Sequence, residues 1–544
     1  MPRGGKTGTA GDGRRFECSG CGDCCKVRGA YSRLYVYERD VEPLAEELGL
    51  SKPAFLRRYC FTDEYGWTQL TMPGDCCAFL DEVTNACAVY SARPTQCRTF
   101  PFWPEFVDGV GASRRWSLAV RRICEGTGSG PAHSTAYAER LIKDLNDLDV
   151  FDEGVPHDWF RYLREHDPVY WQDEDEGSGY WCVTKYADLV YVSCNPQLFS
   201  SWEGGTNIFD LEGGQLDSVR ALMLNMDPPR HGKFRRIVSK GFTPRRIEVL
   251  RRHIKELATT IVDGVAAKGE CDFVDEVAAQ LPMQTICELL GVPEGDRRLV
   301  YELSNRLIGF DDPEFHVDFA SVTDASLQMF EYASSLAAKR REEPGDDLVS
   351  VLVNGEVDGA KLNDLEFNSF FLLLALAGNE TTRTVTSQGM RLLIEHPQQR
   401  QHIVERPELL ATAVEEILRY NPAVIHFRRT ATEDLEMRGR LISRGDKVVL
   451  WYPSVNRDEE VFDNPDLFNI RREPNEHLAF GIGEHFCLGA NLARLQLNTI
   501  FSELLRRIPD MEFDRPVRRL HSNFIDGIKE MRVRFTPEKR GNES

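Results

Sequence analysis

Apolar positions along most of the chain recur at the spacing of one face of an α-helix. This spacing predicts long helices over residues 245–267, 366–395 and 407–420. Strand patterns are shorter, and they occur over 179–193 and, between turn residues, over 424–449. From residue 141 onward the pattern therefore predicts a mainly α-helical fold with small β-sheets.

A change in composition divides the chain near residue 130. The stretch EGTGSGPAHS, residues 125–134, is rich in glycine and serine and is typical of a flexible linker. A chain of 544 residues is also long enough for two or more domains. We expect a Cys-rich domain at 1–124, a linker at 125–140 and a larger domain at 141–544.

The charge is unevenly distributed and restricts the class of partner. The whole chain carries a formal net charge of −20, although residues 1–130 hold 17 basic and 16 acidic residues. Such an acidic protein is not expected to bind nucleic acid. The most apolar run, residues 370–378, is about half of the roughly 20 residues that a bilayer span needs. The first 17 residues lack the apolar segment of a secretory signal, so we expect no transmembrane segment and a cytoplasmic location.

Cysteines are concentrated at the N-terminal end. Ten of the 15 cysteines lie in the first 124 residues, and four of them form the octet CSGCGDCC at 18–25. Disulfides are rare in the cytoplasm. The crowding therefore predicts that thiolates bind a metal there.

One cysteine far from this cluster stands in a distinctive loop, FGIGEHFCLGANLAR, residues 480–494. Cys487 lies just before a helical pattern, where backbone N–H groups and the helix dipole stabilise a thiolate. Gly483 and Gly489 allow the backbone to approach a flat cofactor closely. A single thiolate in such a loop suits an axial ligand of haem iron.

This loop resembles the haem-binding loop of the cytochrome P450 family, and three further motifs occur in the order typical of that family. They are DPPRHGKFRRIVSKGFTP at 227–244, AGNETTR at 377–383 and EEILRY at 415–420. The resemblance covers residues 141–540. It implies the cytochrome P450 fold, haem b with a thiolate ligand, and insertion of one oxygen atom from O2 into a C–H bond. It also implies an electron-transfer reductase as partner.

The same resemblance assigns roles to individual residues. Cys487 corresponds to the iron ligand, and Phe480 would pack near its thiolate. Glu380 and Thr381 correspond to the acid–alcohol pair that delivers protons to dioxygen, and Gly378 would permit a local distortion of the helix. The remaining matches are the propionate-binding residues His231, Arg235, Arg429 and His485 and the fold-stabilising network Glu416, Arg419 and Arg472.

A narrower resemblance concerns the substrate. Residues 421–439 and 455–481 look like the bacterial group that hydroxylates sterol side chains, methyl-branched lipids and terpenoid alcohols. This implies an apolar substrate such as a sterol, an isoprenoid or a branched lipid. The implied pocket residues are Phe371, Leu374, Ala375, Val424, Ile425 and His426. An apolar stripe on a helix is also what core packing requires.

The N-terminal cysteines resemble a small zinc- or iron-chelating family with the pattern CxxCxxCC, over residues 15–128. The implied metal ligands are Cys18, Cys21, Cys24, Cys25, Cys77, Cys87, Cys97 and Cys124. Eight thiolates can fill two four-thiolate sites, or one cluster and one zinc site. The spacing differs from the C-x2-C-x2-C-x3-C-P run of bacterial ferredoxins, so both an iron–sulfur cluster and Zn²⁺ stay open.

Three functions are compatible with this combination. The sequence has no strand followed by GxGxxG, so no flavin or nicotinamide site is indicated and electrons must come from elsewhere. The favoured hypothesis is that the Cys-rich domain relays electrons to the haem. The alternative is a structural zinc docking module that works with a separate ferredoxin. A third hypothesis, a haem-based redox or gas sensor, is disfavoured because a sensor does not need Glu380 and Thr381.

Overall fold

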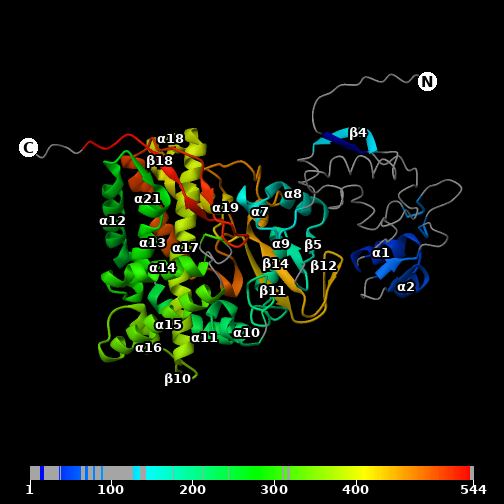
Figure 1. The fold of residues 1–544 in the computed structure, drawn as a ribbon, viewed down its shortest axis with the longest axis horizontal. Coiled ribbons are helices and arrows are strands. Elements are labelled where there is room, and N and C mark those ends of the chain that lie inside the picture. The colour runs from blue at the N-terminus through cyan, green and yellow to red at the C-terminus, as the bar shows by residue number, and fades with distance from the viewer. Residues whose placement is uncertain are drawn as a thin grey trace, which may run out of the picture. The chain divides into compact units, whose positions relative to one another are not determined.

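The computed structural model describes residues 13–16, 36, 38–62, 68–71, 77–79, 87–89, 127–134, 143–174, 177–211, 213–242, 244–308, 312–314 and 319–539. The chain divides into two compact units, Met1–Lys143 and Asp144–Ser544. Figure 1 shows the fold of each unit.

The first unit has a small core of its own. Its elements are α1 (Glu38–Glu47), α2 (Lys52–Tyr59), β1 (Gly13–Phe16), β2 (Cys60–Thr62), β3 (Thr68–Leu70) and β4 (Thr127–Ser134). Leu44 of α1 and Phe55 of α2 are fully buried, and Phe79 stacks on Phe55 with ring centroids 6.3 Å apart. Cys77 is buried in this cluster and Cys87 packs against it. The other predicted thiolate ligands, Cys18, Cys21, Cys24, Cys25, Cys97 and Cys124, lie outside the described residues.

The Gly- and Ser-rich stretch near residue 130 includes a β-strand. Residues 127–134 form β4, which pairs with β1 in antiparallel register from Gly13 opposite Ser134 to Phe16 opposite Thr127. Backbone hydrogen bonds to a partner strand hold this segment. These bonds involve main-chain atoms, so the amino-acid composition of the segment does not predict them.

The second unit contains most of the helices. They are α7 (Asp149–Asp152), α8 (His157–His166), α9 (Tyr186–Cys194), α10 (Gly213–Arg220), α11 (Arg230–Ser239), α12 (Pro244–Ala266), α13 (Gln280–Leu290), α14 (Arg297–Ile308), α15 (Phe319–Glu342), α16 (Leu348–Val353), α17 (Asp364–Glu395), α18 (Pro397–Glu405), α19 (Leu410–Tyr420), α20 (Tyr452–Val455) and α21 (Ala490–Arg507). Short helical turns are η4 (Met223–Asn225), η5 (Lys240–Phe242), η6 (Val274–Ala278), η7 (Glu294–Asp296), η8 (Pro407–Leu409) and η9 (Gly483–His485).

The strands of this unit are short. They are β5 (Val169–Gln172), β6 (Tyr180–Val183), β7 (Phe199–Ser200), β8 (Glu270–Asp272), β9 (Glu356–Val357), β10 (Ala360–Lys361), β11 (His426–Ala431), β12 (Leu435–Met437), β13 (Arg440–Ile442), β14 (Lys447–Trp451), β15 (Glu512–Phe513), β16 (Arg518–Arg519), β17 (Ile528–Glu530) and β18 (Arg532–Arg534). The predicted class, mainly α-helical with small sheets, is confirmed.

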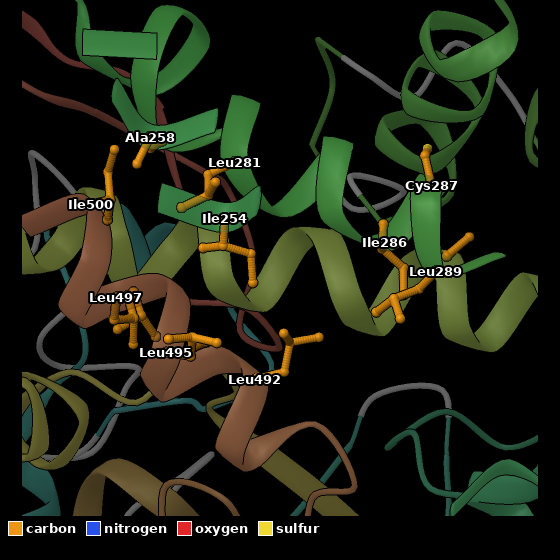
Figure 2. Close-up of a cluster of buried hydrophobic side chains, with 14 of the residues drawn as sticks. Ile254, Ala258, Leu281, Ile286, Cys287, Leu289, Leu492, Leu495, Leu497 and Ile500 are labelled. Carbon is orange, nitrogen blue, oxygen red and sulfur yellow. The ribbon is translucent and has the colours of Figure 1, made fainter. Parts of the chain in front are cut away.

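The long helix α17 organises the helical part. It begins with a capping box, in which Asn363 accepts from the N–H of Glu366 at 2.9 Å and the Glu366 carboxylate accepts from the N–H of Asn363 at 3.0 Å. It packs against α13, α15, α19 and α21. Figure 2 shows side chains of α12, α13 and α21 that meet in this core, including Ile254, Leu281 and Ile500. The helices predicted over 245–267, 366–395 and 407–420 correspond to α12, α17 and the η8–α19 pair.

One mixed sheet forms the other main layer of this unit. Its strand order is β5-β6-β14-β11-β7, and β6 runs parallel to β14 while the other pairs are antiparallel. The strand pattern predicted over 179–193 is only half right, because β6 ends at Val183 and α9 begins at Tyr186. Within the described residues, the structure has no helix with the length and apolarity needed to cross a membrane.

Candidate functional site

The second unit encloses a cavity between α11, α17, β11 and the N-terminal end of α21. Its empty volume is about 1600 Å³, its mouth included. Cys487, Thr381, His231 and Arg429 all line it, although they lie up to 256 positions apart in sequence. The fold therefore brings together residues from each of the sequence motifs.

The Cys487 loop is held in a tight backbone conformation. The Cys487 N–H donates to the carbonyl of Phe480 at 2.9 Å, and Phe486 N–H donates to Gly483 at 3.1 Å. Gly483 has a φ of +75°, and a Cβ there would lie 2.6 Å from the backbone oxygen of Ser193. Only glycine fits at this position, because both the backbone angle and the space exclude a side chain.

The environment of the Cys487 thiol combines burial with positive potential. Burial raises the pKa of Cys487, while the backbone N–H groups of Gly489 and Ala490 at the start of α21 act in the opposite direction. The charges of Arg235 and Arg494 also favour the thiolate. A metal cation at the sulfur would remove the cost of burial, since metal-bound thiols are deprotonated.

Four nitrogen-rich side chains gather at another wall of the cavity, as the sequence predicts. The rings of His231 and His485 lie 4.2 Å apart, and Arg235 donates to the carbonyl of Phe486 at 2.5 Å. Burial and the neighbouring cations, chiefly Arg429, lower the pKa of His485 to about 2. Burial also lowers the pKa of Arg429 and of His231, and the Nδ1 atom of His231 is buried without a hydrogen-bond partner.

These donors fit a ligand with two carboxylates. The charges of Arg235 and Arg429 depress the pKa of both histidines, and an anionic group placed among them would reverse that effect. The thiol, the cluster of donors and the space between them match the chemistry that a haem requires. The geometry therefore agrees with the haem assignment that the resemblance implied.

The residues of α17 that the resemblance assigns to oxygen activation do not all face the cavity. Thr381 lines it, and its hydroxyl donates to the carbonyl of Ala377 at 2.8 Å. Glu380 is 1% exposed and lies outside the cavity lining, where Oε1 accepts from Arg383 at 2.5 Å. Arg383 in turn donates to Asn305 of α14 at 2.9 Å. Successive helix residues point about 100° apart, so these two side chains leave α17 in different directions.

Gly378 lines the cavity and also lies at a close contact between two helices. The chain is α-helical at every residue of α17, and a local distortion at Gly378 where oxygen binds stays a prediction. A Cβ at this position would lie 2.8 Å from two side-chain carbons of Ile286 on α13. The missing side chain lets α13 approach α17 closely.

The predicted pocket residues divide into two groups. Leu374 and Val424 line the cavity, and so does Phe427. Ile425 and His426 do not: strand side chains alternate, so Phe427 and Arg429 face the cavity while His426 packs against Trp451 at 5.2 Å on the other side. Burial lowers the pKa of His426 to about 3, which makes it a neutral core residue and not a polar contact for a substrate.

Phe371 and Ala375 are also core residues. Phe371 is fully buried and its ring lies 6.0 Å from that of Tyr332 on α15. Ala375 is 1% exposed within the same core cluster. Cavity-lining residues that the sequence analysis missed include Leu373 and Thr382 on α17 and Met223 in η4. Helical spacing indicates Leu373, eight residues before Thr381, and Thr382, eight residues after Leu374, whereas η4 has no signal in the sequence.

The Glu416–Arg419–Arg472 network is formed as predicted. Arg419 binds the Glu416 carboxylate through Nε and Nη2, both at 2.8 Å, and Arg472 Nε adds a contact at 3.1 Å. Both Glu416 and Arg419 are fully buried. Arg419 also donates to the carbonyls of Asn456 and Pro465, so the network ties α19 to the segment that leads to the Cys487 loop.

Both parts of the chain match known protein families. The cytochrome P450 family model matches residues 314–509, and the CxxCxxCC model, described as zinc- or iron-chelating, matches residues 17–125. The steroid C26-monooxygenase of Rhodococcus jostii (strain RHA1) is 40% identical over 440 residues, which are 78% of this chain and 92% of the relative.

The chain belongs to the cytochrome P450 family.

Further relatives of this P450 support the same conclusion. The methyl-branched lipid omega-hydroxylase of Mycobacterium tuberculosis (strain ATCC 25618 / H37Rv) is 40% identical over 406 residues, which are 72% of this chain and 94% of the relative. The solved structure of a Mycobacterium marinum cytochrome P450 in complex with pseudoionone has a TM-score of 0.66 and 40% identity, and the match covers 70% of this chain and 94% of that one. A Bacillus megaterium P450 in complex with testosterone has a TM-score of 0.62 and 31% identity, with 70% and 99% coverage. This chain is thus a P450 monooxygenase with an additional N-terminal domain.

Proposed function

We propose that this P450 binds haem b through Cys487 and hydroxylates a sterol, an isoprenoid or a methyl-branched lipid. The observation that carries the proposal is the cavity, in which a thiol, a cluster of donors for two carboxylates and an apolar wall adjoin one another. Haem with a thiolate ligand supplies the oxygen chemistry, because thiolate donation favours cleavage of the O–O bond.

The residues of the chain then have separate tasks. Cys487 supplies the iron ligand, and His231, Arg235, Arg429 and His485 hold the two propionates. The Thr381 hydroxyl faces the reaction space and can pass a proton at Oγ1. Glu380 holds an ionisable carboxylate one residue away, paired with Arg383 behind the cavity wall. Glu416, Arg419 and Arg472 keep in place the segment that leads to the Cys487 loop.

The apolar part of the cavity lining supports a lipid substrate. Leu373, Leu374, Val424 and Phe427 present only carbon atoms from their side chains. The names of the relatives agree with this chemistry: they include a steroid C26-monooxygenase and a methyl-branched lipid omega-hydroxylase. The bound compounds in the solved structures, pseudoionone and testosterone, are also apolar.

Substrate titrations test this assignment. Cholesterol-type sterols and methyl-branched fatty acids should shift the Soret band of the full-length protein, and Phe427→Ala should weaken the apparent binding several-fold. Leu441→Ala, on β13 with Leu441 46% exposed, is the matched control and should leave binding unchanged. A shift with small polar metabolites but with none of the lipids would contradict the proposed substrate class.

We further propose that the N-terminal domain holds an iron–sulfur cluster that relays electrons from a reductase to the haem. The match of the zinc- or iron-chelating family model to residues 17–125 supports metal binding, and Cys77 and Cys87 pack into one small core. A covalently attached donor acts at an effective concentration of roughly mM. The alternative is a zinc-bound docking module with a separate ferredoxin.

Two measurements separate these alternatives. The relay requires iron and acid-labile sulfide in the purified full-length protein, whereas zinc without sulfide would favour the docking module. Removal of residues 1–130 should abolish reductase-supported turnover and leave the haem spectra intact. Full turnover by the shortened chain would contradict the relay.

A further inference from the structure

Three side chains from separate segments form a compact ion-pair group beside the Cys487 loop. Glu415 on α19 accepts two hydrogen bonds from Arg494 on α21, from Nε to Oε1 and from Nη2 to Oε2, each at 2.7 Å. The same Oε2 accepts from Nε2 of His477 at 3.1 Å. We call Glu415, His477 and Arg494 the proximal clamp.

The protonation pattern of the clamp follows from its hydrogen bonds. The N–H of Ala479 donates to Nδ1 of His477 at 3.2 Å, so Nδ1 is an acceptor and the proton lies on Nε2. That proton points at Glu415. The His477 side chain is 2% exposed, and those of Glu415 and Arg494 are 28% and 32% exposed, so the clamp is partly shielded from water.

Two members of the clamp contact the ring of Phe480. The guanidinium carbon of Arg494 lies 4.6 Å from the centroid of the Phe480 ring, and the His477 ring lies 6.1 Å from it. A planar guanidinium over an aromatic face is an attractive contact, and here the bidentate bond to Glu415 orients its plane. Phe480 also accepts the hydrogen bond from the Cys487 N–H through its carbonyl. Phe480, whose ring the clamp contacts, is therefore also hydrogen-bonded to the backbone of Cys487.

We propose that Glu415, His477 and Arg494 are positioning residues that hold the Phe480 ring over the Cys487 loop and so keep water from the thiolate. This inference rests on the assignment of Cys487 as the iron ligand. The amount of hydrogen bonding to a ligating sulfur sets how strongly it donates to the metal and hence the reduction potential. Loss of the clamp should admit water to the sulfur, weaken its donation and shift the potential of the haem upward.

A merely electrostatic role makes a different prediction. If the clamp acted only through its charges, Arg494→Gln would remove a positive charge and lower the potential, whereas Glu415→Gln would remove a negative charge and raise it. Positioning of Phe480 predicts an upward shift for both variants, in the same direction as Phe480→Leu. The sign of the two shifts therefore separates the mechanisms.

The experiment is an anaerobic redox titration of the substrate-free, full-length holoprotein, with the Soret band of the ferrous–CO adduct as a second readout. We expect Arg494→Gln and Glu415→Gln each to raise the potential and to increase the fraction of adduct with a thiol-type band. Arg506→Gln is the matched control, since Arg506 pairs with Glu503 on the same helix and its side chain is 65% exposed. It should match the wild type.

A double-mutant cycle completes the test. In the Phe480→Leu background, the upward shift that each clamp substitution causes through the ring should be lost, because the ring that it positions is gone, and only the direct effect of the removed charge should remain. Shifts of opposite sign in the wild-type background, or shifts that persist unchanged in the Phe480→Leu background, would overturn the proposal. Glu415→Gln keeps the side-chain shape, so the cycle remains available even where Arg494→Gln does not fold. A wild-type adduct without a thiolate-type band would instead overturn the ligand assignment.

Discussion

At the scale of single residues, buried charges in the second unit depend on partners from distant segments. Glu416 is fully buried, and its carboxylate receives Arg419 from the same helix and Arg472 from 56 residues away. Glu415, its neighbour in sequence, instead binds Arg494 and His477. Two adjacent carboxylates of α19 thus hold different residues around the Cys487 loop: Glu416 binds Arg472, and Glu415 binds His477 and Arg494.

Breaking the Glu416 network should destabilise the protein strongly. Arg419→Met leaves the buried Glu416 carboxylate without its bidentate partner, and removal of one member of a buried pair costs about 3–5 kcal/mol. Urea unfolding of the second unit should show this loss. Arg298→Met is the control, because the Arg298–Glu302 pair is 88% and 56% exposed and such exposed pairs contribute little to stability. Equal effects of the two substitutions would contradict the prediction.

Glu415 should contribute to stability in a pH-dependent manner. Despite burial, Arg494 and His477 lower its pKa from 4.5 to about 2. A depressed folded-state pKa stabilises the fold above the unfolded pKa, and this contribution is lost as the pH falls from about 4.5 toward 2. Wild type should exceed Glu415→Gln by about 2–3 kcal/mol at neutral pH, and the gap should close in acid. Parallel stability curves from pH 6 to 3 would show that Glu415 has no such role.

At the scale of secondary-structure elements, one glycine sets how closely two helices pack. Gly378 of α17 faces Ile286 of α13, and the position of this contact brings Thr381 and Ile286 to the same cavity. The missing side chain of Gly378 lets the two helices pack closely. The same element carries Glu380 on its other side, where Arg383 links it to α14.

A side chain at residue 378 should therefore disturb the helix contact. Gly378→Val places a Cβ about 2.8 Å from Ile286, and overpacking of this kind costs about 1–3 kcal/mol. Ile286→Ala should recover part of the loss in thermal unfolding. Gly264→Ala on α12 is the control: nothing lies within 4 Å of its Cβ position, and alanine should stabilise the helix by up to about 1 kcal/mol. Failure of Ile286→Ala to rescue Gly378→Val would contradict this account.

At the scale of the whole molecule, the two units have separate cores. The first unit buries Leu44, Phe55 and Cys77 in one cluster, and the core of the second unit is built only from residues after 144. Each unit can thus bury its own apolar surface, which is the requirement for independent folding. The haem-site residues all belong to the second unit.

The second unit should therefore fold without the first. A chain of residues 144–544 should bind haem, give the same ferrous–CO spectrum as the full-length protein and unfold at the same temperature as the corresponding transition of the full chain. Scanning calorimetry with parallel Soret detection measures both properties. A drop of more than a few degrees, or loss of haem, would show that the N-terminal domain stabilises the haem domain.

Local sequence determined the features that depend on spacing along the chain. The loop around Cys487, the long helix α17 and the Glu416–Arg419 pair were predicted correctly because each is defined by residues within one or two helical turns. The likeness to cytochrome P450 rests on the same local motifs. The CxxCxxCC pattern is equally local, and most of its cysteines lie outside the described residues.

Tertiary structure alone decided which side chains meet. His426 and Phe427 are adjacent in sequence, but the pairing of β11 with β14 buries the first against Trp451 and turns the second toward the cavity. Arg383, one turn from Glu380 on α17, contacts Asn305 of α14, and Glu415 contacts Arg494 and His477. Except for the Glu380–Arg383 pair, these contacts join segments that are distant in sequence. Periodicity tells which residues share a face of an element, but not what covers that face, because that depends on long-range contacts.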